Sequence, residues 1–233
     1  MVRQNIIPRR LATCPVPVCS ACLYAKATRK PWRSKRSIIH IDNVPTKSGE
    51  VVSVDQMVSP TPGLVAQMTG KLTTKRYKYA TVFVDQASRL GYVYLQKTAT
   101  ADETLVAKDA FERYAKDNGT TVNAYHADNG IFKAHAWVNN CTQKQQRLTF
   151  AGVNAHHQNG IVERRIRELQ ELAQTMLIHA AKRWPAAITA NMWPYAIRAA
   201  NDALNEVPNP KLTSKLAPLN LFSNNKVSTN AKH

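Results

Sequence analysis

Residues 77–96 read YKYATVFVDQASRLGYVYLQ, and this stretch sets the fold class. Two runs rich in β-branched and aromatic residues, 77–84 and 91–96, flank a short polar segment, which is typical of an antiparallel β-hairpin. A third such run, VVSVDQMV at 51–58, precedes the hairpin. The sequence therefore predicts three successive antiparallel strands.

Helices and short strands alternate after this hairpin. Apolar residues recur first at helical and then at strand spacing. The pattern predicts, in order, a helix at 100–116, a strand at 121–126, a helix around 133–145, a strand at 148–151, a long helix from 160 to 184 and a last helix at 189–205. This order predicts an α/β fold with a mixed sheet of antiparallel and parallel strands, flanked by helices.

The positive charge of the chain is large and unevenly spread. The 233 residues carry 32 Lys+Arg against 15 Asp+Glu, a formal net charge of +17. Residues 1–36 hold nine of the cations, no acidic residue and four prolines, which indicates an extended or irregular basic arm. We divide the chain into this arm (1–36), a linker (37–50), a core (51–222) and a disordered tail (223–233).

Composition limits the classes of protein. Hydrophobic residues make up 44% of the chain, enough for a real core, and no apolar run reaches the roughly 18 residues of a membrane span. We expect no membrane partner and no secretory signal. The four cysteines are then expected to be reduced thiols or metal ligands. The cationic excess favours a polyanionic partner, because neutralising phosphates releases counterions.

Three acidic residues stand out by their local setting. Asp55 ends the apolar run VVSV, Asp128 lies in YHADNG at a predicted strand end, and Glu163 lies in QNGIVERR at a predicted helix start. A carboxylate inside an apolar strand needs a partner such as a metal ion. Turn formation by Asp128 and a favourable helix-dipole interaction of Glu163 are the structural alternatives. Together the three acids predict a metal-dependent enzyme acting on DNA.

Two further polar positions have competing interpretations. Asp85 also ends an apolar strand, but the following residues favour a structural role, in which it caps the hairpin turn or pairs with Arg89. Arg167 lies one helical turn after Glu163, so it either pairs with that carboxylate or reaches a phosphate beside it. Arg164 and Arg165 are expected on a solvated basic face.

Five motifs together resemble the integrase core of copia-type LTR retrotransposons. The resemblance runs from about residue 14 to about 222 and depends on CSACLYAKATR (19–29), VD (54–55), FVDQASR (83–89), ADNG (127–130) and QNGIVER (158–164). It implies a ribonuclease H-like fold, with a five-stranded mixed sheet. It also implies a polynucleotidyl transferase that processes the ends of element DNA and joins them to target DNA.

The resemblance implies a site as well as a fold. Asp55, Asp128 and Glu163 would be the catalytic and metal-binding residues, holding two Mg²⁺ or Mn²⁺ ions, with Asp55 shared between them. Carboxylates suit these ions because both prefer oxygen ligands. DNA would be the partner, a homo-oligomer the acting form, and the nucleus the place of action, together with cytoplasmic element particles.

Several residues are candidates for binding nucleic acid. Gln158 and Asn159 lie in the loop that leads into the long helix, where an Asn-Gly pair suits a loop that closes on DNA. Arg167 is a candidate phosphate contact on that helix. In the basic arm, Lys26, Arg29 and Lys30 are the candidates.

Cys19 and Cys22 form half of a possible zinc site. In the family two upstream histidines complete the site, yet residues 1–18 contain no histidine. Cys14 and His40 have no spacing that supports them as replacements. Because a closed structural zinc site needs four ligands, zinc is not expected in what looks like a truncated zinc-binding module.

Two alternative functions stay open. The first is a catalytically silent DNA-binding remnant of a decayed element, which the missing histidines favour and the intact acids oppose. The second is a ribonuclease H-type nuclease that cleaves without joining. A preference for RNA–DNA hybrids would favour the nuclease.

Overall fold

Five strands form one mixed sheet in a computed structural model, which describes residues 14, 18–26, 45–65, 73–152, 159–208 and 216–223. The sheet order is β3-β2-β1-β4-β5. The strands are β1 (Val52–Gly63), β2 (Tyr77–Asp85), β3 (Gly91–Gln96), β4 (Ala124–Ala127) and β5 (Arg147–Phe150). β1, β2 and β3 pair antiparallel, whereas β4 pairs parallel to both β1 and β5. The predicted hairpin and mixed sheet are confirmed.

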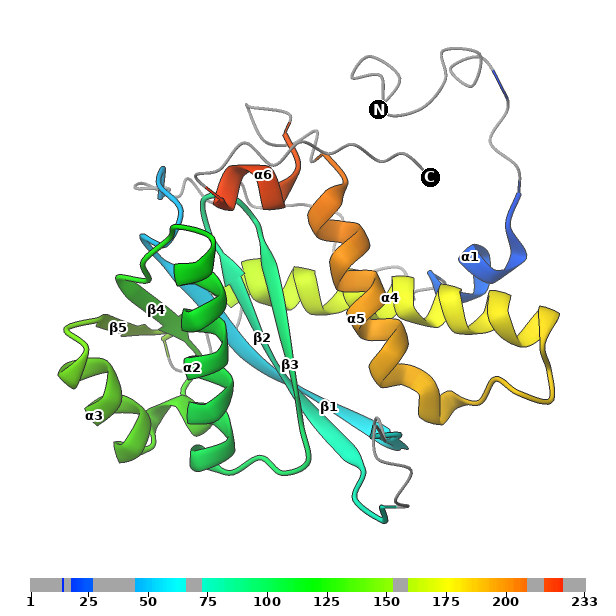
Figure 1. Cartoon of the computed structure of the whole chain (residues 1–233), viewed down its shortest axis with the longest axis horizontal. Coiled ribbons are helices and arrows are strands. Elements are labelled where there is room, and N and C mark those ends of the chain that lie inside the picture. The colour runs from blue at the N-terminus through cyan, green and yellow to red at the C-terminus, as the bar shows by residue number, and fades with distance from the viewer. Residues whose placement is uncertain are drawn as a thin grey trace.

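Helices cover both faces of this sheet (Figure 1). They are α1 (Ser20–Ala25), α2 (Ala101–Asp117), α3 (His135–Gln143), α4 (Gly160–Arg183), α5 (Trp193–Glu206) and α6 (Pro218–Phe222), with 3₁₀ turns at Ile131–Lys133 and Ala190–Met192. No helix in the described part of the chain is long and apolar enough to cross a membrane.

The hydrophobic core consists of two clusters, one on each face of the sheet. One contains Val54 and Phe83 from the sheet and residues of α2, α3 and α6, including Phe111 and Trp137. The other contains Val82 and further strand residues packed against α4 and α5. Neighbouring residues of β2 belong to different clusters because side chains alternate between the faces of a strand.

Within the core, 51–222, the observed helices differ from the predicted ones in three places. The predicted helices at 133–145 and 189–205 each begin with a 3₁₀ turn, and regular helix starts only at His135 and Trp193. Ala134 has an extended ψ of 138°, which separates the 3₁₀ turn at Ile131–Lys133 from α3. Pro194 lies in the first turn of α5, where the missing N–H of proline is tolerated. Helix α6 was not predicted.

Strand β1 is longer than predicted and runs to Gly63 through two prolines. Within the described residues, β4 pairs with β1 along Val52–Val54, so the later part of β1 has an edge where a missing N–H is tolerated. The side chain of Trp193 donates a hydrogen bond to Thr61 O at 2.9 Å. The extension is therefore fastened to the start of α5.

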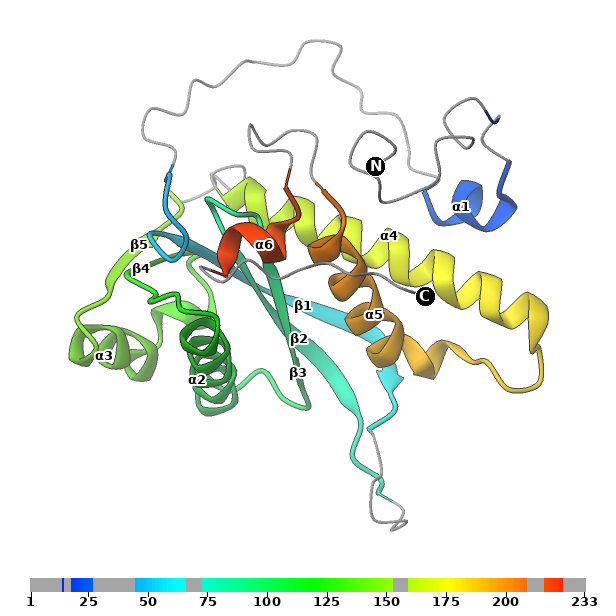
Figure 2. The ribbon, with the colours of Figure 1, turned by 45° about the horizontal axis from the view of Figure 1, so that its top comes forward.

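The basic arm contains one short helix where an extended or irregular arm was predicted. Cys19 caps α1, because its Sγ accepts a hydrogen bond from the amide of Cys22 at 3.2 Å. Ala21 and Ala25, one turn apart, are buried. Figure 2 shows α1 lying along α4, in agreement with Figure 1. Part of the arm therefore packs against the core.

Residues 45–50, which the sequence assigns to a linker, are also held to the core. The amide of Gly49 donates to Asp85 Oδ1 at 2.8 Å, and the Ser48 hydroxyl donates to Leu221 O at 3.0 Å. The remaining linker residues, 37–44, and the tail after Ser223 lie outside the described residues.

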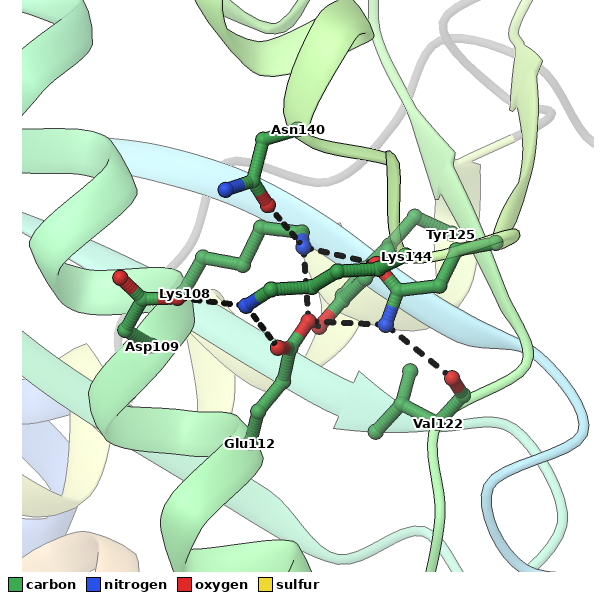
Figure 3. Close-up of polar contacts among 8 residues, drawn as sticks. Lys108, Asp109, Glu112, Val122, Tyr125, Asn140 and Lys144 are labelled. Carbon is green, nitrogen blue, oxygen red and sulfur yellow. Dashed lines mark hydrogen bonds and ion pairs between the residues drawn. The ribbon is translucent and has the colours of Figure 1, made fainter. Parts of the chain in front are cut away.

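A buried charge network joins α2, α3 and β4 (Figure 3). The ammonium of Lys108, a fully buried side chain, lies 2.7 Å from Glu112 and also donates to Asn140 and Gln146. Lys144 donates to the other oxygen of Glu112 at 2.6 Å. The Lys108 ammonium therefore has three hydrogen-bond acceptors, which offset the cost of burying it.

Candidate metal and nucleic-acid site

The sheet register places Asp55 and Asp128 beside each other. β1 and β4 run parallel, and Val54 is paired with Ala127. One step further along each strand comes Asp55 in β1 and Asp128 just after the end of β4. Both carboxylates are partly exposed. The predicted strand and strand-end positions of the two acids are confirmed.

Alternation along the strand sets the face on which Asp55 lies. Val54 and Ala127 both belong to the cluster under α2 and α3. In β1 the next residue, Asp55, points to the opposite face, which α4 and α5 cover. Met57, two residues after Asp55, packs in the cluster of that second face. Asp55 therefore lies on the α4 side of the sheet, and Asp128 follows the end of the neighbouring strand β4.

Asn159 fastens the start of α4 against β1. It is the N-cap residue, is 2% exposed, and donates through Nδ2 to Val54 O at 3.1 Å. Val162 in the first turn is fully buried in the cluster of the same face. Glu163, the next residue, is partly exposed one turn into the helix. The anchored helix start thus brings another carboxylate to the face of the sheet that carries Asp55.

The three carboxylates are not drawn into one tight cluster. Their oxygens do not all lie within 4.8 Å of one another, a condition that only Cys19, Cys22 and His179 meet in the described part of the chain. Asp128 Oδ1 accepts from the amide of Gly130 at 3.1 Å, and Asp55 Oδ1 from the amide of Gln56 at 2.7 Å. Each aspartate is thus hydrogen-bonded to a backbone amide of its own segment.

Oxygen chemistry decides which ions the acids suit. Asp55, Asp128 and Glu163 offer only carboxylate oxygens, the ligands that Mg²⁺ and Mn²⁺ prefer. Partial exposure leaves room for the waters that Mg²⁺ keeps. The donor set therefore fits the divalent ions that the sequence predicts.

The predicted nucleic-acid contacts lie in different environments. Lys26 and Arg167 are exposed. Asn159 is buried and positions α4, so its predicted contact with nucleic acid stays a prediction, beside a structural role that the sequence did not indicate. Gln158, Arg29 and Lys30 lie outside the described residues.

Asp85 has the structural role that the sequence favours. It is fully buried, and its Oδ2 accepts hydrogen bonds from the Ser88 amide at 2.7 Å and the Ser88 hydroxyl at 2.6 Å. Burial raises the pKa of Asp85, and hydrogen bonds from Ser88 and Gly49 partly oppose that shift. The prediction that this carboxylate caps the hairpin turn is confirmed.

The arginines that follow Glu163 are not equivalent. Arg165 was expected on a solvated face, but it is buried and donates to Asn205 Oδ1 at 2.6 Å and Arg89 O at 3.0 Å. That expectation is wrong, because the helix turns Arg165 towards α5. Burial lowers its pKa to about 10. Within the described residues, Arg167 forms no ion pair with Glu163 and stays exposed.

Sequence reasoning missed His179 as a partner of the cysteine pair. Cys19 Sγ lies 2.9 Å from His179 Nε2, and the Cys22 thiol is close to both. Hydrogen bonds from the amide and the thiol of Cys22, with a smaller contribution from His179, lower the pKa of Cys19 to about 7. No local spacing could reveal this group, because His179 follows Cys19 by 160 positions. Cys14 is not part of the group, and His40 lies outside the described residues.

Two curated relatives resemble most of the chain. The retrovirus-related Pol polyprotein from transposon RE1 of Arabidopsis thaliana is 28% identical over 196 residues, 83% of this chain. The corresponding polyprotein from transposon RE2 of the same plant is 26% identical over 198 residues. The chain spans only 12% of the length of these relatives. No protein-family model matches the chain.

Solved structures share the fold. A chain of the simian T-cell lymphotropic virus intasome matches 90% of this chain, with a TM-score of 0.60 at 17% identity, over 64% of its own length. The HTLV-2 integrase catalytic core domain in complex with magnesium matches 76% of this chain and 97% of its own, with a TM-score of 0.51 at 21% identity. The BIV integrase catalytic core domain matches 75% of this chain and 93% of its own length, with a TM-score of 0.50 at 21% identity. The predicted ribonuclease H-like fold is confirmed.

Proposed function

We propose that this chain, a homologue of retrovirus-related Pol polyproteins with the fold of integrase catalytic cores, is the integrase core of a retrotransposon. Its reaction would be polynucleotidyl transfer, which processes element DNA ends and joins them to target DNA. One observation supports the reaction most directly. Asp55 in β1 and Asp128 after β4 follow paired residues of neighbouring strands, and Glu163 lies in the first turn of α4, whose start is hydrogen-bonded to β1.

Each acid has a role in this proposal. Asp55 would contact two Mg²⁺ or Mn²⁺ ions, with Asp128 completing one site and Glu163 the other. Such ions stabilise the attacking and leaving oxygens of an in-line displacement at phosphorus. The related HTLV-2 core was solved in complex with magnesium, which supports the choice of ion.

Residues around the acids would position them and the DNA. Asn159, four residues before Glu163, holds the start of α4 on β1 at Val54, the residue before Asp55. Arg164 and Arg167 are exposed next to Glu163 and would contact the phosphates of a bound strand. Gln158 precedes the same helix start and would contact base or sugar. Lys26, Arg29 and Lys30 would add phosphate contacts from the arm.

The proposal also concerns the oligomeric state of the chain on DNA. The HTLV-2 core is described in a trimeric form, and the simian viral chain comes from an intasome. We propose that this chain likewise acts as a homo-oligomer on the ends of element DNA and a target duplex. Action on chromosomal DNA would place it in the nucleus, after assembly in cytoplasmic particles.

A strand-transfer assay tests the proposal. Glu163→Gln keeps the size of the side chain but removes its charge, so Mg²⁺- or Mn²⁺-dependent joining of labelled duplex DNA should fall by at least about a hundredfold. Asp55→Asn should have the same effect. Glu171→Gln, two turns further along α4, is the matched control and should retain activity.

The substrates separate the alternatives. Cleavage of an RNA–DNA hybrid without joining of DNA would identify the ribonuclease H-type nuclease instead. DNA binding with neither joining nor cleavage, in the wild type as well as in both variants, would identify the silent DNA-binding remnant. Full activity in Glu163→Gln would remove this carboxylate from the reaction.

A further inference from the structure

Three soft donor atoms meet between the basic arm and helix α4. Cys19 and Cys22 come from the start of α1, and His179 comes from the C-terminal half of α4. The Sγ atoms of both cysteines and a ring nitrogen of His179 lie within 4.8 Å of one another. The cysteines are partly exposed and the histidine is exposed, so an ion has access from solvent.

Packing of α1 holds these donors in place. Ala21 and Ala25 are buried, and the Lys182 ammonium donates a hydrogen bond to the Ser20 hydroxyl. Lys182 follows His179 by almost one turn of α4. In both views of the chain α1 lies beside α4 (Figures 1 and 2). The two cysteines and the histidine are therefore brought together by a helix–helix contact that extends beyond them.

The donor types select the ion. Two thiolates and one imidazole suit Zn²⁺, whose bonds to sulfur and nitrogen are about 2.3 and 2.0–2.1 Å long. Donors that close together need only small side-chain rotations to surround one tetrahedral ion. Mg²⁺ is a poor match because it prefers oxygen ligands. The amide of Cys22 already donates to Cys19 Sγ, and such outer-shell hydrogen bonds support a metal-bound thiolate.

We propose that Cys19, Cys22 and His179 bind one Zn²⁺ ion that fastens the basic arm to helix α4. The ion would have three protein ligands from the described residues and a fourth position for water or another donor. Unlike the family's zinc module, whose histidines precede the cysteines, this site takes its histidine from the core. The ion would thereby hold α1, and Lys26 directly after it, next to α4.

This site is separate from the acidic one. His179 follows Glu163 by sixteen residues on the same helix, which is about 24 Å along its axis. The proposal therefore does not depend on the proposed integrase reaction, and it can hold or fail independently of that reaction.

Zinc binding by the full chain tests the proposal. The reduced protein, dialysed against a chelator and then titrated with Zn²⁺, should bind one ion per chain, measured by elemental analysis. His179→Ala and Cys22→Ser should each weaken binding by at least about tenfold. His135→Ala and Cys14→Ser are matched controls outside the group, and both should bind as the wild type does. Co²⁺ in place of Zn²⁺ should give the absorption of a thiolate-bound tetrahedral ion.

Hydrogen exchange provides a second readout on the unmutated chain. Saturating Zn²⁺ should slow exchange of the α1 amides at 20–25, because opening this helix then requires loss of a ligand. The proposal is overturned if the reduced wild type binds no stoichiometric zinc. It is also overturned if His179→Ala binds zinc as tightly as the wild type, because the arm alone would then hold the ion.

Discussion

Gly49 has a φ of +80°, a backbone conformation that side chains other than glycine rarely adopt. A Cβ atom at this position would lie 2.1 Å from Thr121 O, a backbone atom. The amide of Gly49 donates to Asp85, and its carbonyl accepts from the amide of Asn123 at 2.8 Å. Gly49, three residues before the start of β1, thus joins the hairpin turn to the segment that leads into β4.

Replacing this glycine tests how much the junction contributes. Gly49→Ala should lower the free energy of unfolding by at least about 1–3 kcal/mol, because both the φ angle and the contact with Thr121 become unfavourable. Gly160→Ala is the control, since a Cβ there meets no atom within 4 Å. Urea denaturation, followed by circular dichroism, measures the free energy of unfolding of both variants. Equal midpoints for the wild type and Gly49→Ala would contradict the strain argument.

Single residues also show where sequence reasoning about the site ends. The turn-capping role of Asp85 follows from its neighbours in the sequence, because its partners in the turn lie within three residues. The burial of Arg165 depends on Asn205, forty positions away, and could not be inferred from the adjacent charges. The positioning role of Asn159 likewise depends on a contact with distant β1.

At the scale of elements, the charge network of Figure 3 links α2 to α3 and β4. Burial alone would raise the pKa of Glu112, but hydrogen bonds from Lys108, Lys144 and Gln146 outweigh burial and leave this pKa below its ordinary value. A carboxyl group with a lower pKa in the folded than in the unfolded state stabilises the fold above the unfolded pKa. That stabilisation is lost as the pH falls through the folded pKa.

Glu112→Gln tests this electrostatic link. The variant should lose about 2–4 kcal/mol of stability near neutral pH, because Lys108 stays buried without its anion. The difference from the wild type should shrink as the pH falls below the ordinary Glu pKa of about 4.3 and through the lower pKa of the folded carboxyl, where the wild type also takes up a proton. Denaturant unfolding at a series of pH values measures this difference in the free energy of unfolding.

Asp109→Asn is the matched control for that series. Asp109 also pairs with Lys144, at 2.7 Å, but its side chain is 53% exposed. Its loss should cost less than about 1 kcal/mol at any pH. A pH-independent difference between the wild type and Glu112→Gln would show that packing, and not charge, explains the effect.

Across the whole molecule, a net charge of +17 coexists with the three carboxylates of the proposed metal site. Arg164 and Arg167 are exposed on α4 close to Glu163 in the sequence, and Lys26 is exposed just after α1. A polyanion would be attracted by the overall charge, whereas divalent ions would be attracted by the acids. The start of α4 carries both kinds of group, because Glu163 and the exposed Arg164 and Arg167 all lie in its first turns.

Charge neutralisation in the arm tests its share of DNA binding. Changing Arg29, Lys30, Arg33, Lys35 and Arg36 together to Gln leaves α1 and its cysteines intact. The slope of log affinity against log salt should become shallower by up to about 4 to 5, if all five contact phosphates of duplex DNA. Fluorescence anisotropy over a salt series measures the slope.

Two exposed cations on α2 provide the control for the arm. Arg113→Gln with Lys116→Gln removes charge from the sheet face opposite Asp55, and the slope should stay unchanged. An unchanged slope in the arm variant would mean that these arm residues do not contact the DNA.

The mixed α/β fold, the hairpin at 77–96 and the strand and helix positions of the three acids could all be predicted from the sequence. These features depend on short-range patterns, namely alternation along strands and periodicity along helices, which neighbouring residues express. The position of Asp55 on the α4 side, the burial of Arg165 and the contact of His179 with Cys19 became visible only in the folded chain. Each of these contacts joins segments far apart in the chain, and only the packing of helices on the sheet brings such segments together.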